Sequence, residues 1–256
     1  MINTLYYKYT DIEDVQKTKE KQQDITEQLG LQGKILVSEE GINGNLTGTK
    51  DGVEKYQSWL TSQQQFKDIQ FKDTETAKHN FTRMIVKIRD EIITTHNDPN
   101  KNLVKKRAPH LEPQKLKELI EKKEDLVIVD ARNNYEYKEG RFKDAVHLNI
   151  DKFSEWFEEA QKLEEHKDKT IVTYCTGGIR CEKASAHLKQ NGFENVYQLQ
   201  GGILQYGQEI GNTYWKGNCF VFDKRHSIPI HPKKQGNDEH QIENYEPYKE
   251  KKQLKQ

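Results

Sequence analysis

The stretch from residue 170 to residue 190 limits what this chain can fold into more than any other. It begins with the β-rich apolar run Thr170–Tyr174, continues through Cys175 and a glycine pair, and ends in a helical pattern. A strand that stops at a cysteine and re-enters a helix about six residues later turns the N–H groups of the loop inward, at the positive end of the helix dipole. The sequence therefore predicts an anion-binding loop with the sulfur of Cys175 at its floor.

The residues that follow the cysteine suit this role, and they are Thr176, Gly177, Gly178, Ile179 and Arg180. The glycines permit backbone angles that a side chain resists and let an anion approach the amides. Arg180 adds a positive charge that does not titrate at working pH. Because only the thiolate gains from these groups, we expect the pKa of the Cys175 thiol to fall from about 8.5 to about 7 or below, which makes Cys175 the nucleophile. A buried structural cysteine at a tight turn is the alternative.

Two further cysteines, Cys181 and Cys219, complete the set. The three thiols form neither an even framework nor a Cys-x-x-Cys pair, and they lack the ligand spacing of a zinc site, so we expect no metal. Cys181 follows Arg180 on the first turn of the predicted helix. It is a candidate resolving thiol for an oxidised Cys175, or a small residue packed at a helix start.

The length and charge of the chain restrict its class. A chain of 256 residues suggests about two domains. Lysine and arginine number 41, as do aspartate and glutamate, so no global field marks a nucleic-acid or membrane binder, and any such binding must be local. The start of the chain lacks a signal pattern, and no apolar run approaches the roughly 20 residues of a membrane helix. We expect a cytoplasmic protein that does not bind membranes.

The first 94 residues follow the order β-α-β-β-α-β. Strand-like segments cover residues 2–9, 34–39, 45–49 and 69–74, and helix-like segments cover residues 11–29 and 50–62. This order predicts a ferredoxin-like α+β domain, typically with about four antiparallel strands and two helices on one face. The turn Glu39–Gly44 is either a weak candidate contact or only a turn. Residues 84–95 are expected to form one more extended segment.

Residues 95–113 turn polar and contain prolines, which predicts a linker. The densest basic run of the chain lies here, with Lys101, Lys105, Lys106 and Arg107. Such a run is either a solvated loop or a grip on phosphates beside an active site, and both interpretations stay open.

Residues 114–211 alternate strands and helices, which predicts an α/β domain with a parallel sheet, helices on both faces and the cysteine loop at the carboxyl end of a strand. A helix is expected over residues 153–165 from the spacing of its apolar residues. Asp130 and Arg132, at a strand end, are expected to brace the neighbouring loops. Residues 212–230 predict a hairpin packed on this domain, and residues 231–256 a disordered tail.

The loop Cys175-Thr-Gly-Gly-Ile-Arg180 resembles the Cys-x-x-Gly-x-Arg loop of the rhodanese superfamily. The preceding stretch, from Asp130-Ala-Arg132 to Ile150, is similar to the same family, although Arg141 and Asp144 stand where it commonly has His and Gly. The related dual-specificity phosphatases carry one more residue between Cys and Arg to hold a phosphate. The resemblance therefore implies a rhodanese-like fold and a cysteine that can carry a persulfide.

A wider resemblance covers roughly residues 1–230. The segments Val37–Gly44, Tyr174–Lys183 and Tyr214–Asp223 together resemble the bacterial tRNA uridine-34 hydroxylase family. This resemblance implies oxygen-dependent conversion of the wobble uridine to 5-hydroxyuridine, tRNA as partner, and an essential Cys175. Molecular oxygen and an unknown electron donor are implied as co-reactants, and no other cofactor is evident.

A wobble base lies in a single-stranded loop, so its pocket should offer stacking groups and nearby cations. Candidate groups are the aromatic Tyr135 and Tyr137 and the basic Lys105, Lys106, Arg107 and Arg141. Three hypotheses remain: an RNA-modifying enzyme, a sulfurtransferase supplied by a sulfur donor protein or small thiol, and a non-catalytic module that binds anions or a protein.

Overall fold

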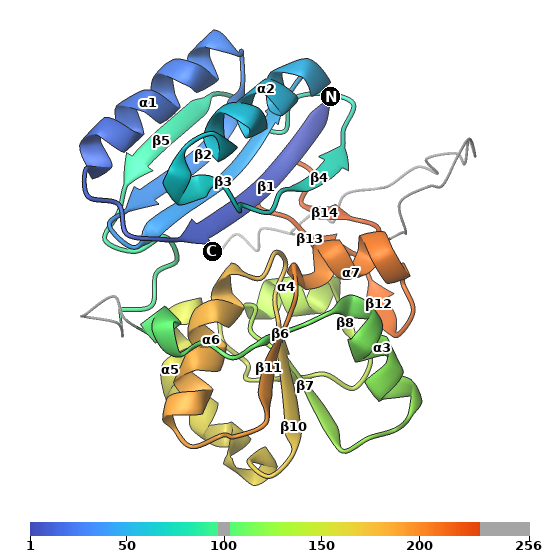
Figure 1. The fold of residues 1–256 in the computed structure, drawn as a ribbon. Helices are drawn as coiled ribbons and strands as arrows, with labels where there is room; N and C mark the ends of the chain where they lie inside the picture. Colours follow the sequence, from blue (N-terminus) through green and yellow to red (C-terminus); the bar gives the residue numbers. More distant parts are fainter. Residues whose placement is uncertain (97–102, 231–256) are drawn as a thin grey trace, which may run out of the picture.

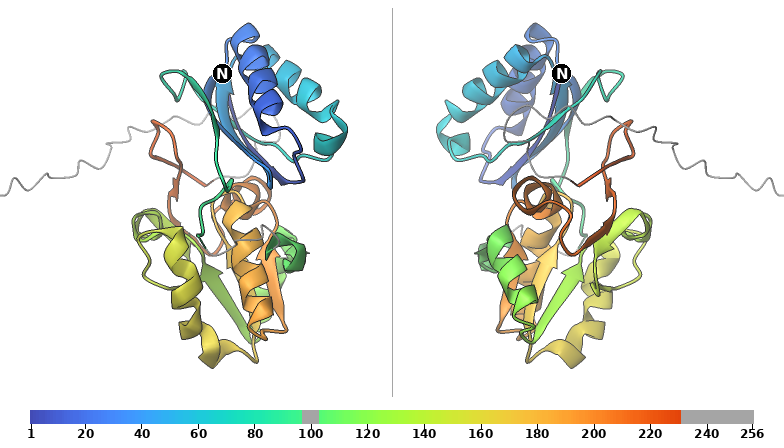
Figure 2. Two further views of the ribbon diagram at one scale, coloured as in Figure 1. Left: turned by 90° about the vertical axis from the view of Figure 1, so that its left-hand side faces the viewer. Right: turned by 90° about the vertical axis from the view of Figure 1, so that its right-hand side faces the viewer.

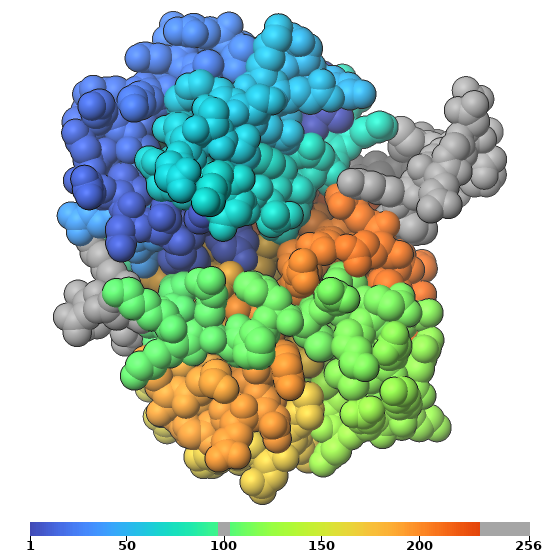
Figure 3. All heavy atoms as spheres, viewed as in Figure 1, coloured from blue at the N-terminus to red at the C-terminus, as the bar shows by residue number. Residues whose placement is uncertain are grey.

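The computed structural model describes residues 1–96 and 103–230, and they form two sheet domains in contact (Figure 1). The predicted combination of an α+β domain followed by an α/β domain is confirmed. The space-filling view shows the blue-to-teal N-terminal domain seated on the green-to-orange second domain (Figure 3). None of the described helices is long and apolar enough to cross a membrane. The predicted tail, residues 231–256, lies outside the described residues.

The N-terminal domain is one five-stranded sheet with two helices. In chain order its elements are β1 (Ile2–Tyr9), α1 (Val15–Gln28), β2 (Gln32–Ser38), β3 (Gly41–Gly48), α2 (Lys50–Thr61), the 3₁₀ helix η1 (Gln64–Phe66), β4 (Lys72–Glu75) and β5 (Met84–Ile88). The strand order is β4-β1-β3-β2-β5. The first four strands are antiparallel as predicted, and β5 adds a fifth strand parallel to β2.

Alternate residues of this sheet face opposite ways. Tyr6, Ile35 and Leu46 are fully buried in the core beneath α1 and α2, which cover one face of the sheet (Figure 1). Their neighbours Tyr7 and Asn45 point to the other face, where they line a cavity shared with the second domain. The uncovered face of the N-terminal sheet is therefore turned toward the cysteine loop.

The extended segment expected over residues 84–95 is shorter than predicted. Strand β5 ends at Ile88, and the Glu91 carboxylate then accepts hydrogen bonds from the Thr95 backbone and hydroxyl at 2.8 and 2.5 Å. These bonds fold the chain back on itself, which a strand does not allow. The residue pattern alone did not show this competition between side chain and sheet.

The second domain is a five-stranded parallel sheet of order β6-β11-β10-β7-β9. Its elements in chain order are β6 (His110–Leu111), α3 (Pro113–Glu121), β7 (Leu126–Asp130), α4 (Asn134–Glu139), β8 (Gly140–Phe142), β9 (Val146–His147), η3 (Phe153–Glu155), α5 (Trp156–Glu159), η4 (Ala160–His166), β10 (Thr170–Tyr174), α6 (Ile179–Gln190), β11 (Val196–Leu199) and α7 (Gly202–Ile210). Separate apolar cores fill its two faces, one containing Ile171 and the other Val172.

Two predictions for this part of the chain were wrong in detail. The helix expected over residues 153–165 is the short α5 between the 3₁₀ segments η3 and η4, although the buried residues of this stretch recur at spacings of three and four. The expected linker contains structure as well. Its described part holds the 3₁₀ helix η2 (Leu103–Lys106), whose Leu103 and Val104 are buried, and strand β6.

The C-terminal segment contacts both domains instead of only the second. Strand β12 (Trp215–Gly217) pairs with β8, and β13 (Cys219–Phe220) pairs antiparallel with β14 (Ser227–Ile228). In the turn between β13 and β14, the Arg225 guanidinium donates to Thr74 Oγ1 of β4 at 2.9 Å. Both side views show this orange-to-brown segment rising from the second domain toward the N-terminal sheet (Figure 2).

Candidate active site

The cysteine loop lies at the carboxyl end of β10, in the middle of the parallel sheet. Two carbonyls of the loop, those of Cys175 and Thr176, accept the N–H groups of Ile203 and Leu204 in the first turn of α7, at 3.0 and 3.1 Å. With the carbonyls held on that side, the loop amides turn toward the sulfur, and Gly178 N donates to Cys175 Sγ at 3.2 Å. The strand-loop-helix arrangement thus forms an anion site at the start of α6.

The surroundings of Cys175 favour its thiolate. Burial alone raises the pKa of this thiol, but a hydrogen bond from Cys181, the charge of Arg180 and the N–H groups of Arg180 and Gly178 outweigh it and lower the pKa to about 5. Cys175 is a free cysteine in the wall of a cavity. The arrangement therefore suits a nucleophilic sulfur.

Cys181 lies on the first turn of α6 and is fully buried. Burial and the adjacent Cys175 sulfur hold the pKa of the Cys181 thiol well above its usual range, so Cys181 stays a thiol that donates its proton toward Cys175. The candidate resolving thiol is thus in hydrogen-bond contact with the sulfur that it would have to reach.

The sequence suggested that Arg180 provides a free positive charge at the end of the loop, but the structure pairs it with a carboxylate. Its guanidinium binds the Glu136 carboxylate through two hydrogen bonds of 2.6 and 2.7 Å. Glu136 is held in turn at the start of α4, where its carboxylate accepts the Asn133 N–H at 3.2 Å, and Thr176 Oγ1 donates to Glu136 Oε1 at 3.4 Å. Sequence reasoning missed Glu136, although the Asn-x-x-Glu signature of a helix start was readable.

Asp130 and Arg132 brace the floor of the site, as expected. Both side chains are fully buried, and the Arg132 guanidinium binds Asp130 and the Gly140 carbonyl at 2.6 Å each. Tyr174 Oη donates to the same Asp130 carboxylate at 2.5 Å. This network fixes the ends of β7 and β10, between which the cysteine loop emerges.

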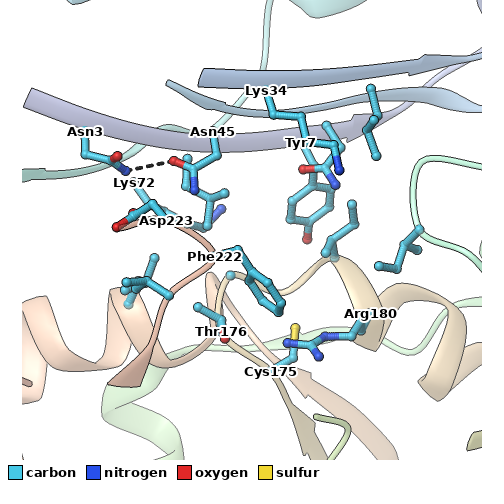
Figure 4. Close-up of a pocket in the computed structure, with 18 of the residues that line it drawn as sticks. Asn3, Tyr7, Lys34, Asn45, Lys72, Cys175, Thr176, Arg180, Phe222 and Asp223 are labelled. Atoms are coloured by element: carbon cyan, nitrogen blue, oxygen red, sulfur yellow. Dashed lines mark hydrogen bonds between the residues drawn. The ribbon is translucent and has the colours of Figure 1, made fainter. Parts of the chain in front are cut away.

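A cavity of about 320 Å³ separates the cysteine loop from the N-terminal sheet. Figure 4 shows Tyr7 and Asn45 hanging from the sheet above, Cys175 and Arg180 below, and the ring of Phe222 between them. The Arg180 guanidinium carbon lies 5.6 Å from the centre of that ring. The cavity is therefore built from the N-terminal sheet, the cysteine loop and the C-terminal hairpin together.

The loop glycines bring the two domains into direct contact. A Cβ on Gly177 would lie 2.7 Å from Leu5 Cδ2, and a Cβ on Gly178 would lie 2.9 Å from Tyr7 Oη. Gly178 also has φ = 100°, in the left-handed region that favours glycine. The glycines thus serve the domain contact as well as the approach of an anion to the amides.

Beside the loop, Glu182 of α6 gathers groups from both domains. Its carboxylate accepts a hydrogen bond from the Tyr7 hydroxyl at 2.9 Å. The same carboxylate lies 3.2 Å from the Arg107 guanidinium and 3.3 Å from the His110 ring nitrogen. The ammonium of Lys72 lies 5.1 Å from the centre of the Tyr7 ring. Sequence reasoning singled out none of Glu182, Tyr7 and Lys72, because their partners are far apart in the chain.

The predicted RNA contacts do not converge on the cavity. Lys105 and Lys106 are exposed on η2, and Arg107 is engaged by Glu182. Arg141 lies on β8, 4.7 Å from the centre of the Tyr137 ring, and does not line the cavity. The structure places Tyr135 and Tyr137 against Phe220 and His147, at 5.0 and 4.4 Å between ring centres, and Lys101 lies outside the described residues.

The turn predicted over Glu39–Gly44 is shorter in the structure, where only Glu39 and Glu40 turn and β3 begins at Gly41, and Glu40 faces the second domain. Glu40 and Glu91 pair with the fully buried Lys183 of α6 at 2.8 and 2.9 Å. This ion-pair cluster joins the two domains beside Tyr9, whose ring centre lies 5.8 Å from the Lys183 ammonium. Within residues 1–96 and 103–230, no group of three His, Cys, Asp or Glu side chains is arranged to hold a metal ion.

Comparison with known proteins covers both domains. Residues 1–92 match the family model described as UPF0176 acylphosphatase like domain, and residues 112–209 match the Rhodanese-like domain. The chain is 41% identical over 224 residues to a protein named tRNA uridine(34) hydroxylase from Cytophaga hutchinsonii, an alignment that covers 86% of this chain and 70% of the relative. Proteins of the same name from Onion yellows phytoplasma and Bacillus licheniformis are 40% and 42% identical over 90% of this chain, and 75% and 72% of their own lengths are covered.

Proposed function

This chain belongs to the tRNA uridine(34) hydroxylase family, and from this we propose that it oxidises the wobble uridine of tRNA to 5-hydroxyuridine in the cavity above Cys175. The observation that carries the proposal is the sulfur of Cys175, favoured as a thiolate and facing a cavity that both domains build. The N-terminal sheet supplies one wall of this cavity, which the second domain alone does not provide.

The cavity suits an extruded pyrimidine. Aromatic rings of Tyr7 and Phe222 offer stacking surfaces, and the amides of Asn43 and Asn45 offer hydrogen-bonding groups for the edge of a base. Asn45 Oδ1 accepts from Asn3 at 2.9 Å and Asn43 Nδ2 donates to the Ile92 carbonyl at 3.0 Å, so both amides are held in fixed orientations. Fixed groups of this kind discriminate between bases by leaving the wrong edge unpaired.

The chemical role follows from the thiolate. Uracil is electrophilic at C6, so addition of the Cys175 sulfur there makes C5 the nucleophilic carbon. With molecular oxygen as oxidant, C5 forms a bond to one oxygen atom, which becomes the C5 hydroxyl, and the other oxygen atom leaves as water. An external reductant supplies two electrons, and three protons are taken up in this step, one of which is returned in the next. Loss of the C5 proton and of the thiolate then restores the ring and the free enzyme.

Persulfide transfer is the second candidate, because the hydrogen bond from Gly178 N to Cys175 Sγ equally favours a sulfur carried on the cysteine. A transferase of this class would move sulfur from thiosulfate to cyanide without any tRNA. The two functions differ in their product, and both require Cys175.

The test measures tRNA nucleosides by mass spectrometry in cells whose own copy of the gene is deleted. These cells are supplied with a gene for the wild-type protein, Cys175→Ser or Cys219→Ser. Cys219 is an equally buried free cysteine outside the loop, which makes it the matched control. We expect 5-hydroxyuridine with wild type and Cys219→Ser, and none with Cys175→Ser. Retention of the modified nucleoside with Cys175→Ser overturns the proposal, and thiosulfate-to-cyanide transfer without tRNA hydroxylation favours the second candidate.

A further inference from the structure

The buried lysine of the N-terminal sheet faces the cysteine loop across the domain contact. We propose that Lys72 is a positioning residue of the Cys175 site, whose unpaired ammonium adds to the loop a positive charge that helps to hold the sulfur as a thiolate. The inference rests on the proposed function only in taking Cys175 as the reactive group. It makes the N-terminal domain a working part of the active site.

The second domain by itself offers Cys175 little net positive charge. Arg180 is the cation of the loop and favours the thiolate, but it shares its charge with Glu136 through two hydrogen bonds, and the side chains of the pair are 5% and 0% exposed. Cys181 is a neutral donor, and Cys219 is likewise buried with a raised pKa. Any further positive charge that stabilises the thiolate, beyond the loop amides, Cys181 and the shared charge of Arg180, must therefore come from elsewhere.

Lys72 meets that need in position and in lack of a partner. It begins β4, is 6% exposed and lines the cavity with Cys175. Its side chain approaches the loop, because a Cβ on Gly177 would lie 4.0 Å from Lys72 Cδ. Among the described residues its ammonium interacts with the Tyr7 ring and makes neither an ion pair nor a hydrogen bond. A buried ammonium without a carboxylate is costly unless another anion compensates it.

The charged groups around Lys72 identify that anion. Burial lowers the pKa of Lys72 to about 8, and Cys175 and Glu182 oppose the decrease. Glu182 already serves Tyr7, Arg107, His110 and Gln198, whereas Cys175 has no cation of its own beyond the paired Arg180. Because coupling between two charges is reciprocal, an ammonium stabilised by the thiolate stabilises the thiolate equally.

The experiment measures the thiol directly in the full-length protein without tRNA. The rate of Cys175 alkylation by iodoacetamide is followed against pH by mass spectrometry of tryptic peptides, since cleavage after Arg180 separates Cys175 from Cys181. We compare wild type, Lys72→Met, Lys72→Arg and the control Lys34→Met, which removes an exposed lysine that lines the same cavity.

Lys72→Met should raise the midpoint of alkylation by about one pKa unit, the lower end of the effect of a neighbouring charge. Lys72→Arg should keep the midpoint near that of wild type, and Lys34→Met should leave it unchanged. A Lys72→Met midpoint equal to that of wild type overturns the inference, and so does an equal rise with Lys34→Met.

A second measurement decides the matter should Lys72→Met fail to fold. In Cys175→Ser the thiolate is gone, so the pH midpoint for labelling the Lys72 amine with acetic anhydride should decrease from its wild-type value. An unchanged midpoint overturns the inference. Both readouts are independent of tRNA, so a shifted thiol together with 5-hydroxyuridine retained in Cys175→Ser would reject the proposed function and keep the role of Lys72.

Discussion

Arg180 and Glu136 form a two-bond ion pair of 2.6 and 2.7 Å beside the loop that carries Cys175. The arginine belongs to the loop and the glutamate to α4, so the pair ties the cysteine loop to a neighbouring helix. It fixes the guanidinium while it cancels much of its charge. The loop amides and the Cys181 hydrogen bond therefore stabilise the thiolate together with an arginine whose charge is shared.

Replacing Glu136 with Gln should leave the Arg180 charge buried and unpaired. Breaking a buried pair by removing one partner costs about 3 kcal/mol or more, so the free energy of unfolding in urea should decrease by about that amount. The control Glu139→Gln changes a residue of the same helix that makes no ion pair within the described residues, and it should stay within about 0.5 kcal/mol of wild type. Equal stability of the two variants would show that the pair has no such weight.

Gly177→Ala should force the Leu5 side chain of the N-terminal sheet to move. The added Cβ would lie 2.7 Å from Leu5 Cδ2, and because only the end of a side chain must shift, we expect a cost of about 1 kcal/mol, the lower end of overpacking effects. Leu5→Ala in the same chain makes room and should restore most of the stability. Urea unfolding of both single variants and the double variant gives the coupling energy, and additive effects would contradict direct contact between the domains at this point.

Glu91 should contribute to the acid sensitivity of the domain contact. Burial raises the pKa of its carboxyl, but hydrogen bonds from Thr95, Lys183 and two backbone N–H groups outweigh it and lower the pKa to about 2. Because the folded pKa is depressed, this stability is complete above the ordinary value of 4.5 and is lost as pH falls toward 2.

The check is a series of urea unfolding curves across that pH range. Glu91→Gln should be less stable than wild type at neutral pH, and the difference should shrink as the pH falls. Glu54→Gln, on the exposed surface of α2, should follow the wild-type curve at every pH. A constant difference between Glu91→Gln and wild type would show that ionisation of Glu91 is not involved.

The exposed lysines of η2 should bind tRNA phosphates beside the active site. The logarithm of the tRNA association constant falls with the logarithm of the salt concentration. Each lysine that neutralises a phosphate contributes about 0.7–0.9 to the steepness of this fall, so Lys105→Ala with Lys106→Ala should make it shallower by about 1.5. The matched control, Lys50→Ala with Lys55→Ala on the outer helix α2, removes the same charge far from the loop. Filter binding at several salt concentrations measures the slope for wild type and for each double variant. If the η2 variant has the same slope as the α2 control, η2 does not contact tRNA phosphates.

Local chemistry made the cysteine loop predictable, and long-range contact made the rest of the site unpredictable. A strand, a cysteine, two glycines and a helix specify the loop within a few residues, and alternating elements specify the parallel sheet. The wall of the cavity that the N-terminal sheet supplies depends on how the two domains meet. Nothing near Lys72 or Tyr7 in the chain signals their approach to Cys175, and a linker that looked polar gave no sign that Leu103 and Val104 are buried, with Leu103 in a core of the second domain.

The central claim is that the loop holds Cys175 ionised at neutral pH, and the pH midpoint of its alkylation in the unmodified protein tests this most directly. Our account predicts a midpoint well below 7, near the pKa of about 5 that the surrounding groups produce. A midpoint at or above about 8.5, the value of an ordinary cysteine, would contradict the account.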